Sequence, residues 1–147
     1  MNHDELLRIL VIDDASNYTE NISRILRNAG HAVRAQRVED DEDLRNGLEE
    51  GGWDMVIAKV KVPYFSAHEA IDIVNHSDSE IPVVLVADDE EDEVLDQLLL
   101  EGASNLIDTD HPQRTIHTLL REQTNGHMRA ELMRLREDMQ HTNARAQ

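Results

Sequence analysis

The chain contains no cysteine, which excludes disulfide bonds and thiol catalysis. It also has no apolar run long enough to span a bilayer, and its acidic start lacks the basic and apolar regions of a cleavable signal. We therefore expect a cytoplasmic protein. Its 147 residues and 39% hydrophobic content fit one domain with a short appendage.

Lysine is nearly absent, because the only two lysines are Lys59 and Lys61, which lie close together. Acidic side chains dominate the first part of the chain: residues 1–110 hold 27 acidic and 8 basic side chains, whereas residues 111–147 hold 4 and 6. A body this acidic repels a phosphate backbone, and the remaining residues form no dense basic patch. We therefore expect no binding to nucleic acid.

Short apolar runs alternate with amphipathic stretches along the chain, which is typical of parallel strands joined by helices. This pattern predicts an α/β fold with a doubly wound sheet of five parallel strands covered by helices on both faces. Proline favours the first turn of a helix, so Pro112 marks the start of the last one. The predicted strands cover residues 8–12, 32–35, 55–60, 83–86 and 106–107, and the earlier helices cover residues 16–29, 41–50, 67–75 and 91–100.

In such a sheet, functional groups gather beyond the carboxyl ends of the strands. The first predicted strand ends in Asp13 and Asp14, the third in Lys59 and the fourth in Val86, and Thr109 closely follows the fifth. We therefore expect any functional pocket to lie at this edge of the sheet.

Five sequence features follow one another in order along the chain. They are the run from Ile9 to Asp14, the run from Trp53 to Ile57, Pro63, the run from Ile81 to Val84, and the pair Gly102 and Ala103. Together they resemble the receiver domain of bacterial two-component response regulators, over roughly residues 6–122. The resemblance implies a flavodoxin-like fold with strand order 2-1-3-4-5, followed here by a C-terminal helical extension.

The resemblance also implies a set of site residues. Active receivers use a carboxylate on the third strand to attack a phosphoryl donor. This carboxylate and an acidic pair bind magnesium, whereas a hydroxyl on the fourth strand and a lysine on the fifth contact the phosphoryl group. An aromatic residue on the fifth strand reports the change. By position, Asp13 and Asp14 match the acidic pair. The other positions depart from the family: Lys59 stands at the phosphoacceptor, Val86 at the hydroxyl, Thr109 at the lysine, Asp110 at the proline that follows it, and Leu106 at the aromatic switch.

These departures remove the family's chemistry together. An ammonium group has no oxygen with which to form an acyl phosphate, and valine cannot hydrogen-bond to a phosphoryl oxygen. Magnesium needs oxygen ligands, so replacing a carboxylate by a cation weakens its site. We therefore predict a degenerate pocket with no catalytic residue, no metal and no cofactor, in a protein that is not an enzyme and has no small-molecule substrate in this fragment.

Lys59 has two interpretations. Its ammonium replaces the metal by pairing with Asp13 or Asp14, or its side chain extends outward into solvent from the strand end. We favour the internal cation, because these positions converge at one edge of the sheet. Lys61 has no assigned role.

The alternative function is an active phosphoacceptor that uses Mg²⁺ and a displaced aspartate, for which Asp54 and Asp108 are the candidates. Asp54 lies at the opposite end of its strand, and Asp108 lacks the setting of the third strand.

The acidic runs 40–43 and 88–93 are interpreted as helix starts rather than metal sites. His117, His127 and His141 are interpreted as surface residues.

The end of the chain predicts a helix with an apolar seam, formed by Met128, Leu132, Leu135 and Met139 at spacings of 4, 3 and 4. We divide the chain into a pseudo-receiver, residues 1–124, and a helical linker, residues 125–147, which we expect to lead into output domains. The expected partners are other proteins or a second copy, bound through the fourth and C-terminal helices. Leu95, Leu99 and Leu100 form the candidate interaction face on the fourth helix.

A narrower resemblance is carried by Arg27–Ala35 and Arg37–Asp40, which are similar to the N-terminal receiver of FimX-like cyclic-di-GMP signalling proteins. In that family a degenerate receiver precedes PAS, GGDEF and EAL domains. None of the nucleotide-binding motifs is present in these 147 residues. The resemblance therefore implies a regulatory N-terminus, with any nucleotide binding assigned to other domains.

Overall fold

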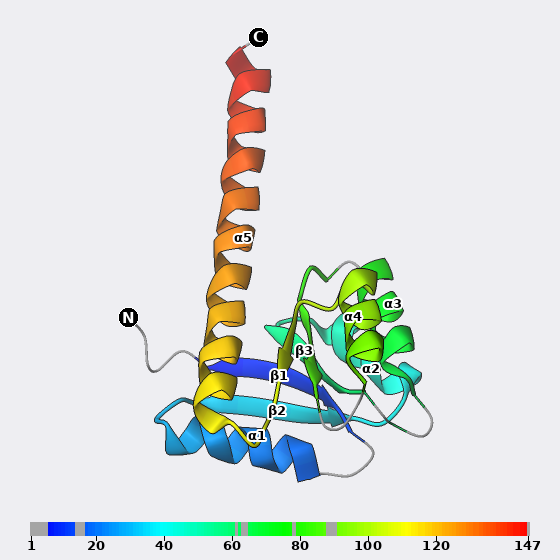
Figure 1. Cartoon of the computed structure of the whole chain (residues 1–147). Coiled ribbons are helices and arrows are strands. Elements are labelled where there is room, and N and C mark those ends of the chain that lie inside the picture. Colours follow the sequence, from blue (N-terminus) through cyan, green and yellow to red (C-terminus); the bar gives the residue numbers. More distant parts are fainter. Residues whose placement is uncertain are drawn as a thin grey trace.

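The computed structural model describes residues 6–13, 17–60, 62, 65–77, 79–87 and 91–146, with side chains up to residue 139. Asp14, Lys61 and Pro63 lie outside these residues. The described chain alternates strands with helices (Figure 1). The elements are β1 (Leu7–Ile12), α1 (Asn17–Asn28), β2 (Val33–Val38), α2 (Asp41–Glu50), β3 (Met55–Lys59), α3 (Ala67–His76), β4 (Val83–Val86), α4 (Asp92–Glu101), β5 (Asn105–Ile107) and α5 (Pro112–Ala146).

The five strands form one parallel sheet in the order β2-β1-β3-β4-β5. This confirms the predicted flavodoxin-like fold, and the predicted element positions agree to within a few residues. The largest difference is β2, which extends to Val38 rather than residue 35, because it pairs with β1 along its whole length from Val33. The sequence pattern underestimated the length of β2 because its second half is mostly polar, and an edge strand needs fewer apolar side chains than a central one.

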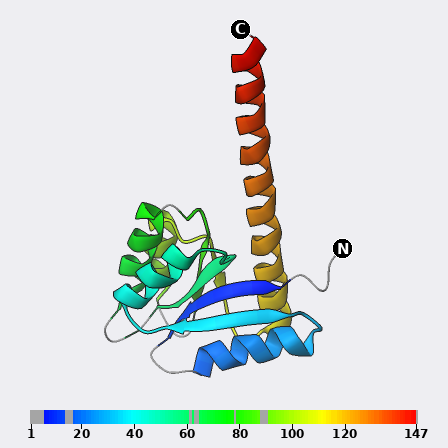
Figure 2. The ribbon, with the colours of Figure 1, turned by 180° about the vertical axis from the view of Figure 1, so that it is seen from behind.

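Alternate residues of each strand face opposite sides of the sheet. On β1, Leu10 and Ile12 pack in a cluster with residues of α2, α3 and α4, whereas Ile9 and Val11 pack with residues of α1 and α5. Figures 1 and 2 show the same two layers, with α2, α3 and α4 grouped on one side and α1 with the first part of α5 on the other. Both faces of the central strands are therefore buried.

Helix starts are fixed by local capping. Asp40 adopts an extended backbone and its side chain accepts a hydrogen bond of 2.8 Å from the Asp43 amide, so this acidic run opens α2 as predicted. Ser66 caps α3 in the same way, by accepting from the Glu69 amide at 3.2 Å. Residues 88–90 of the second acidic run lie outside the described chain, and α4 begins at Asp92.

The last helix, α5, is continuous for 35 residues from Pro112, the predicted start, and passes through Gly126 without a break. Ile116 and Leu119 are buried against the sheet, and Gln123 is the last buried residue of the described side chains. Beyond it the helix projects away from the body (Figures 1 and 2). Within the described residues, no helix is both long enough and apolar enough to cross a membrane.

Candidate functional site

The strand register brings the predicted pocket residues to one edge of the sheet. Lys59 pairs in register with Val86, and Val86 pairs with Ile107. Asp13 directly follows Ile12, which pairs with Ala58, so Asp13 lies one step beyond this pair on the same edge as Lys59. The carboxyl edge thus holds a carboxylate, a cation and an apolar side chain on neighbouring strands.

Asp13, Lys59 and Val86 also share one face of the sheet. Val11 and Ile57 pack with α1 and α5, and strand alternation gives Asp13 and Lys59 the same direction. The Lys59 ammonium accordingly lies over the ring of Tyr18 on α1, with Nζ 5.1 Å from the ring centre. A cation at this distance from an aromatic face is stabilised by the ring's quadrupole. The Lys59 side chain is half-buried here, and its pairing with Asp13 or Asp14 stays a prediction.

Asp13 is a buried carboxylate that fixes the start of α1. Its side chain is 1% exposed, and Oδ2 accepts a hydrogen bond of 3.0 Å from the Tyr18 amide. Its main chain is held as well, because its amide donates to the Val38 carbonyl at 3.2 Å and its carbonyl accepts from Arg37 Nη1 at 3.4 Å. A negative charge at this helix start is favourable, since the helix dipole is positive there.

The described residues of this edge do not fit a magnesium ion. A hard divalent cation needs several oxygen ligands, whereas the third strand contributes the Lys59 ammonium. No group of three or more metal-ligating side chains is found in the part of the chain that the structure describes, which does not include Asp14. The third strand instead supplies a permanent cation on the sheet face that also carries the buried Asp13.

The remaining pocket positions offer little that could bind a phosphoryl group. Val86 is buried and apolar. Leu106, which the resemblance assigns to the aromatic switch, packs half-buried against the cluster on the side of α2, α3 and α4. Thr109 lies in the turn after β5 and is half-buried.

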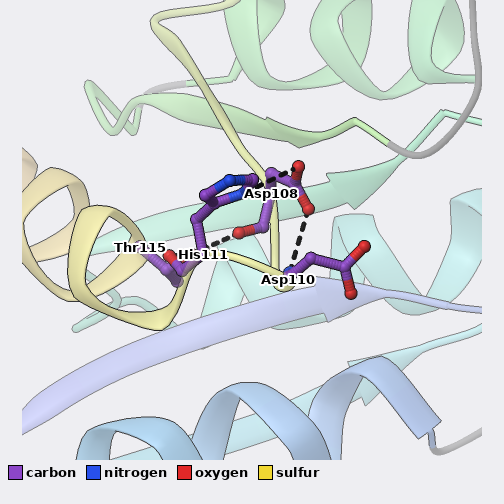
Figure 3. A network of polar contacts seen from close by, with 4 residues as sticks. All are labelled: Asp108, Asp110, His111 and Thr115. Carbon is purple, nitrogen blue, oxygen red and sulfur yellow. Dashed lines mark hydrogen bonds and ion pairs between the residues drawn. The ribbon is translucent and has the colours of Figure 1, made fainter.

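Sequence reasoning missed a polar network that joins this turn to α5 (Figure 3). Asp108 Oδ1 accepts from the Asp110 amide at 2.9 Å, and Asp108 Oδ2 lies 3.1 Å from His111 Nδ1. The Asp108 carbonyl accepts from the fully buried Thr115 hydroxyl at 2.9 Å. The only local signal was a threonine in the first turn of a helix that begins with proline. The network makes Asp108 a structural residue of the turn.

Asp54, the other candidate for a displaced phosphoacceptor, lies at the amino edge of the sheet. Its carboxylate is 15% exposed and accepts from the Arg8 amide at 2.8 Å and from Gln123 Nε2 at 3.4 Å. The same carboxylate lies 3.2 Å from His127 Nε2. These contacts join β1 and β3 to α5 at the point where the helix leaves the body.

The predicted interaction face on α4 is wrong in part. Leu95 is 9% exposed and belongs to the core, and Leu99 is half-buried against the cluster on the side of α2, α3 and α4. Leu100 is 82% exposed. The buried Leu95 and Leu98 and the half-buried Leu99 form the normal inward stripe of an amphipathic helix, so the three predicted leucines do not share an exposed face.

We expect Lys59→Ala to lower the melting temperature more than Lys61→Ala. Removing Lys59 loses the contact with the Tyr18 ring, worth about 0.5–1 kcal/mol, and takes a positive charge from the sheet face that carries the buried Asp13. Lys61→Ala removes the same charge without touching the Tyr18 contact, which makes it the matched control. Thermal unfolding followed by circular dichroism measures both, and equal losses would contradict an internal cation.

Comparisons with known proteins agree with this architecture. Residues 9–121 match the family model described as response regulator receiver domain. The structure is similar to NtrX from Brucella abortus, with a TM-score of 0.75 and 19% identity over 89% of this chain, which spans only 30% of NtrX. It is also similar to the signal receiver domain of a LuxO repressor protein from Vibrio parahaemolyticus, with a TM-score of 0.74 and 15% identity over 87% of this chain and 98% of that one.

A third solved structure is the receiver domain of a sensor histidine kinase from Pseudomonas aeruginosa with magnesium coordinated in its active-site cleft. Its TM-score is 0.68, at 15% identity over 82% of this chain and 99% of that one. A comparison with curated protein sequences finds no match. At these identities the solved structures establish the shared fold.

Proposed function

Because its residues 9–121 match the family model, this chain belongs to the response regulator receiver domain family, and we propose that it is a receiver that signals without being phosphorylated. The observation that carries the proposal is the Lys59 ammonium on the third strand, over Tyr18 and on the same face as Asp13. The resemblance assigns Lys59 to the position where the family carries its attacking carboxylate.

Three properties of the pocket support the loss of phosphotransfer. The Lys59 ammonium has no oxygen with which to form an acyl phosphate. Its positive charge opposes a divalent cation at the same edge, unlike the Pseudomonas receiver, whose cleft coordinates magnesium. Val86 offers the phosphoryl group no hydroxyl. A change at one of these two positions could be tolerated alone, but the three properties together act against the same reaction.

A receiver without this chemistry has to work through protein contacts. We propose that it binds a protein partner or a second copy, and that α5 is the main contact surface together with the exposed Leu100 of α4. The resemblance to FimX-like proteins supports a regulatory role at the N-terminus of a cyclic-di-GMP signalling protein. In that arrangement the module itself is not an enzyme, binds no cyclic-di-GMP, and acts in the cytoplasm.

The direct test is incubation with Mg²⁺ and acetyl phosphate, followed by intact-mass spectrometry. We expect the mass of the chain to stay unchanged, while a receiver with the complete family site, treated in parallel, gains one phosphoryl group. A stable phosphoryl adduct on this chain would overturn the proposal. Asp54→Asn and Asp108→Asn would then identify which displaced aspartate carries the adduct.

A further inference from the structure

The projecting part of α5 carries an unpartnered apolar seam. Met128, Leu132, Leu135 and Met139 are between 49% and 65% exposed, although each is a large apolar side chain. Their spacing of 4, 3 and 4 places them in one stripe along the helix, at the alternating core positions of a heptad repeat. The body of the domain leaves this stripe open to a second helix.

Charged residues flank the seam with one sign on each side. In this heptad, Leu132 and Met139 lie at the first core position, and Met128 and Leu135 lie at the second. Arg129 and Arg136 directly follow the second core position. Glu131 and Asp138 precede the first. One border of the stripe is therefore basic and the other acidic. Such flanking positions set the orientation of paired helices, because they meet across the interface.

This arrangement selects one orientation for two identical helices. In a parallel pair, the acidic border of one helix meets the basic border of the other, so that Glu131 faces the partner's Arg136, five residues further along. In an antiparallel pair, like borders meet: Arg129 faces the partner's Arg136, and Glu131 faces the partner's Asp138. Like charges across an interface are unfavourable.

We propose that a second copy of this chain covers the seam, and that the two α5 helices pair in parallel and in register as a two-stranded coiled coil. This inference rests on the proposed function, because it names the partner that a phosphorylation-independent receiver would use. Parallel pairing places both bodies at the same end of the coiled coil.

Two further features support pairing in this register. Asn125 lies seven residues before Leu132, at the same heptad position, and one asparagine there favours a parallel dimer in a single register. Asn125 also lines an open groove of about 680 Å³ at the foot of the seam, together with Ser104, Glu122, Met128, Arg129 and Leu132. The seam thus continues into a surface hollow of the body, next to β5.

The seam does not have to nucleate a helix of its own. An isolated helix of two heptads is unstable because its first turn is costly to nucleate. Here the seam extends a helix whose first turns are fixed by Ile116 and Leu119 in the core. Glu131 pairs with Arg134 on the same helix, which lowers the pKa of Glu131 from its usual value.

Disulfide trapping tests the orientation, since the chain has no cysteine of its own. The full chain carrying Met139→Cys should form a covalent dimer under mild oxidation, and so should Met128→Cys, because identical core positions adjoin in a parallel pair. Ala130→Cys, on the opposite face of the same exposed helix, is the matched control and should remain mostly monomeric. A disulfide requires Cα atoms within about 7 Å, whereas residues 128 and 139 are about 16 Å apart along a helix.

Mixing the Met128→Cys and Met139→Cys chains distinguishes the alternatives. Parallel pairing predicts dimers of each variant with itself, whereas a preference for the mixed dimer would show antiparallel pairing and overturn the proposal. Equal trapping of Ala130→Cys would mean that the contacts are random collisions, and would overturn it as well.

Charge exchange provides a second test. Arg136→Glu should reduce self-association measured by sedimentation equilibrium, and adding Glu131→Arg to it should restore most of the association. A chain that takes up no phosphoryl group but forms no seam disulfide would leave the proposed function standing and contradict the coiled coil alone. A chain that is phosphorylated yet forms the seam disulfide would overturn the proposed function and leave the coiled coil standing.

Discussion

Lys59→Asp should destabilise the fold in metal-free buffer and make its stability respond to Mg²⁺, whereas the unchanged chain should not respond. The substitution places a carboxylate where the ammonium now lies, on the same sheet face as the buried Asp13. Two like charges about 4 Å apart repel by about 1–4 kcal/mol between the dielectric limits of water and a protein surface. The loss should appear in the free energy of unfolding measured by urea with a chelator present.

Magnesium should then reverse much of this loss, because the variant regains the carboxylate that a hard divalent cation needs. Binding to the folded state alone adds about 2.7 kcal/mol when the free ion exceeds its dissociation constant a hundredfold. Lys61→Asp makes the same change of charge at the other lysine and is the matched control. A similar magnesium response in both variants, or in the unchanged chain, would contradict the view that Lys59 occupies the metal's place.

Leu119→Ala should lower the free energy of unfolding by about 2–5 kcal/mol, the usual range for truncating a fully buried leucine. Leu119 is completely buried on α5 and packs in the cluster that contains Ile9, Ile57 and Leu26. The cavity left behind would weaken the attachment of α5 to the sheet. Chemical denaturation with a two-state fit measures the loss directly.

Leu132→Ala makes the same substitution on the same helix and serves as the control. Leu132 is 51% exposed beyond the body, so unfolding of the dilute monomer should change by no more than about 0.5 kcal/mol. Its self-association should fall, however, because it lies at the centre of the seam. If both variants lost the same stability, the outer part of α5 would have to be packed on the body rather than projecting from it.

The sheet could be predicted from the sequence because its central strands are short apolar runs separated by amphipathic stretches. The meeting of the strand ends at one edge followed from the same information, since strand ends are local features and parallel strands place their carboxyl ends on one edge. The roles of the residues at that edge rest on the resemblance and stay a prediction. Register and alternation then put Lys59 on the face of Asp13. No such rule fixes the contact with Tyr18, which depends on where α1 lies against the sheet.

Contacts between distant parts of the chain could not be predicted. Asp54 meets Gln123 and His127, which lie 69 and 73 residues further along, and nothing near Asp54 in the sequence indicates either partner. The sequence indicated a surface role for His127, and its partner became visible only once α5 was seen to cross the whole sheet. The misplaced leucines of α4 had a different cause: the helix has apolar residues on more than one side, so periodicity alone left its inward direction open.

The continuous helix α5 can act as a lever with a short arm, which packs on the sheet up to Gln123, and a long arm, which projects beyond it. The short arm starts at the carboxyl edge, where the Thr115 hydroxyl donates a hydrogen bond to the Asp108 carbonyl, and Asp54 contacts His127 where the helix leaves the body. The distance from Leu119 to Met139 is about 30 Å at 1.5 Å per residue, so a tilt of about 5° at the body moves Met139 by about 3 Å. Because coupling between two sites is reciprocal, a partner that fixes the long arm must bias the pocket by the same free energy as the pocket biases the partner. Under the proposed function, in which no phosphoryl group drives the receiver, the input can therefore arrive through the helix.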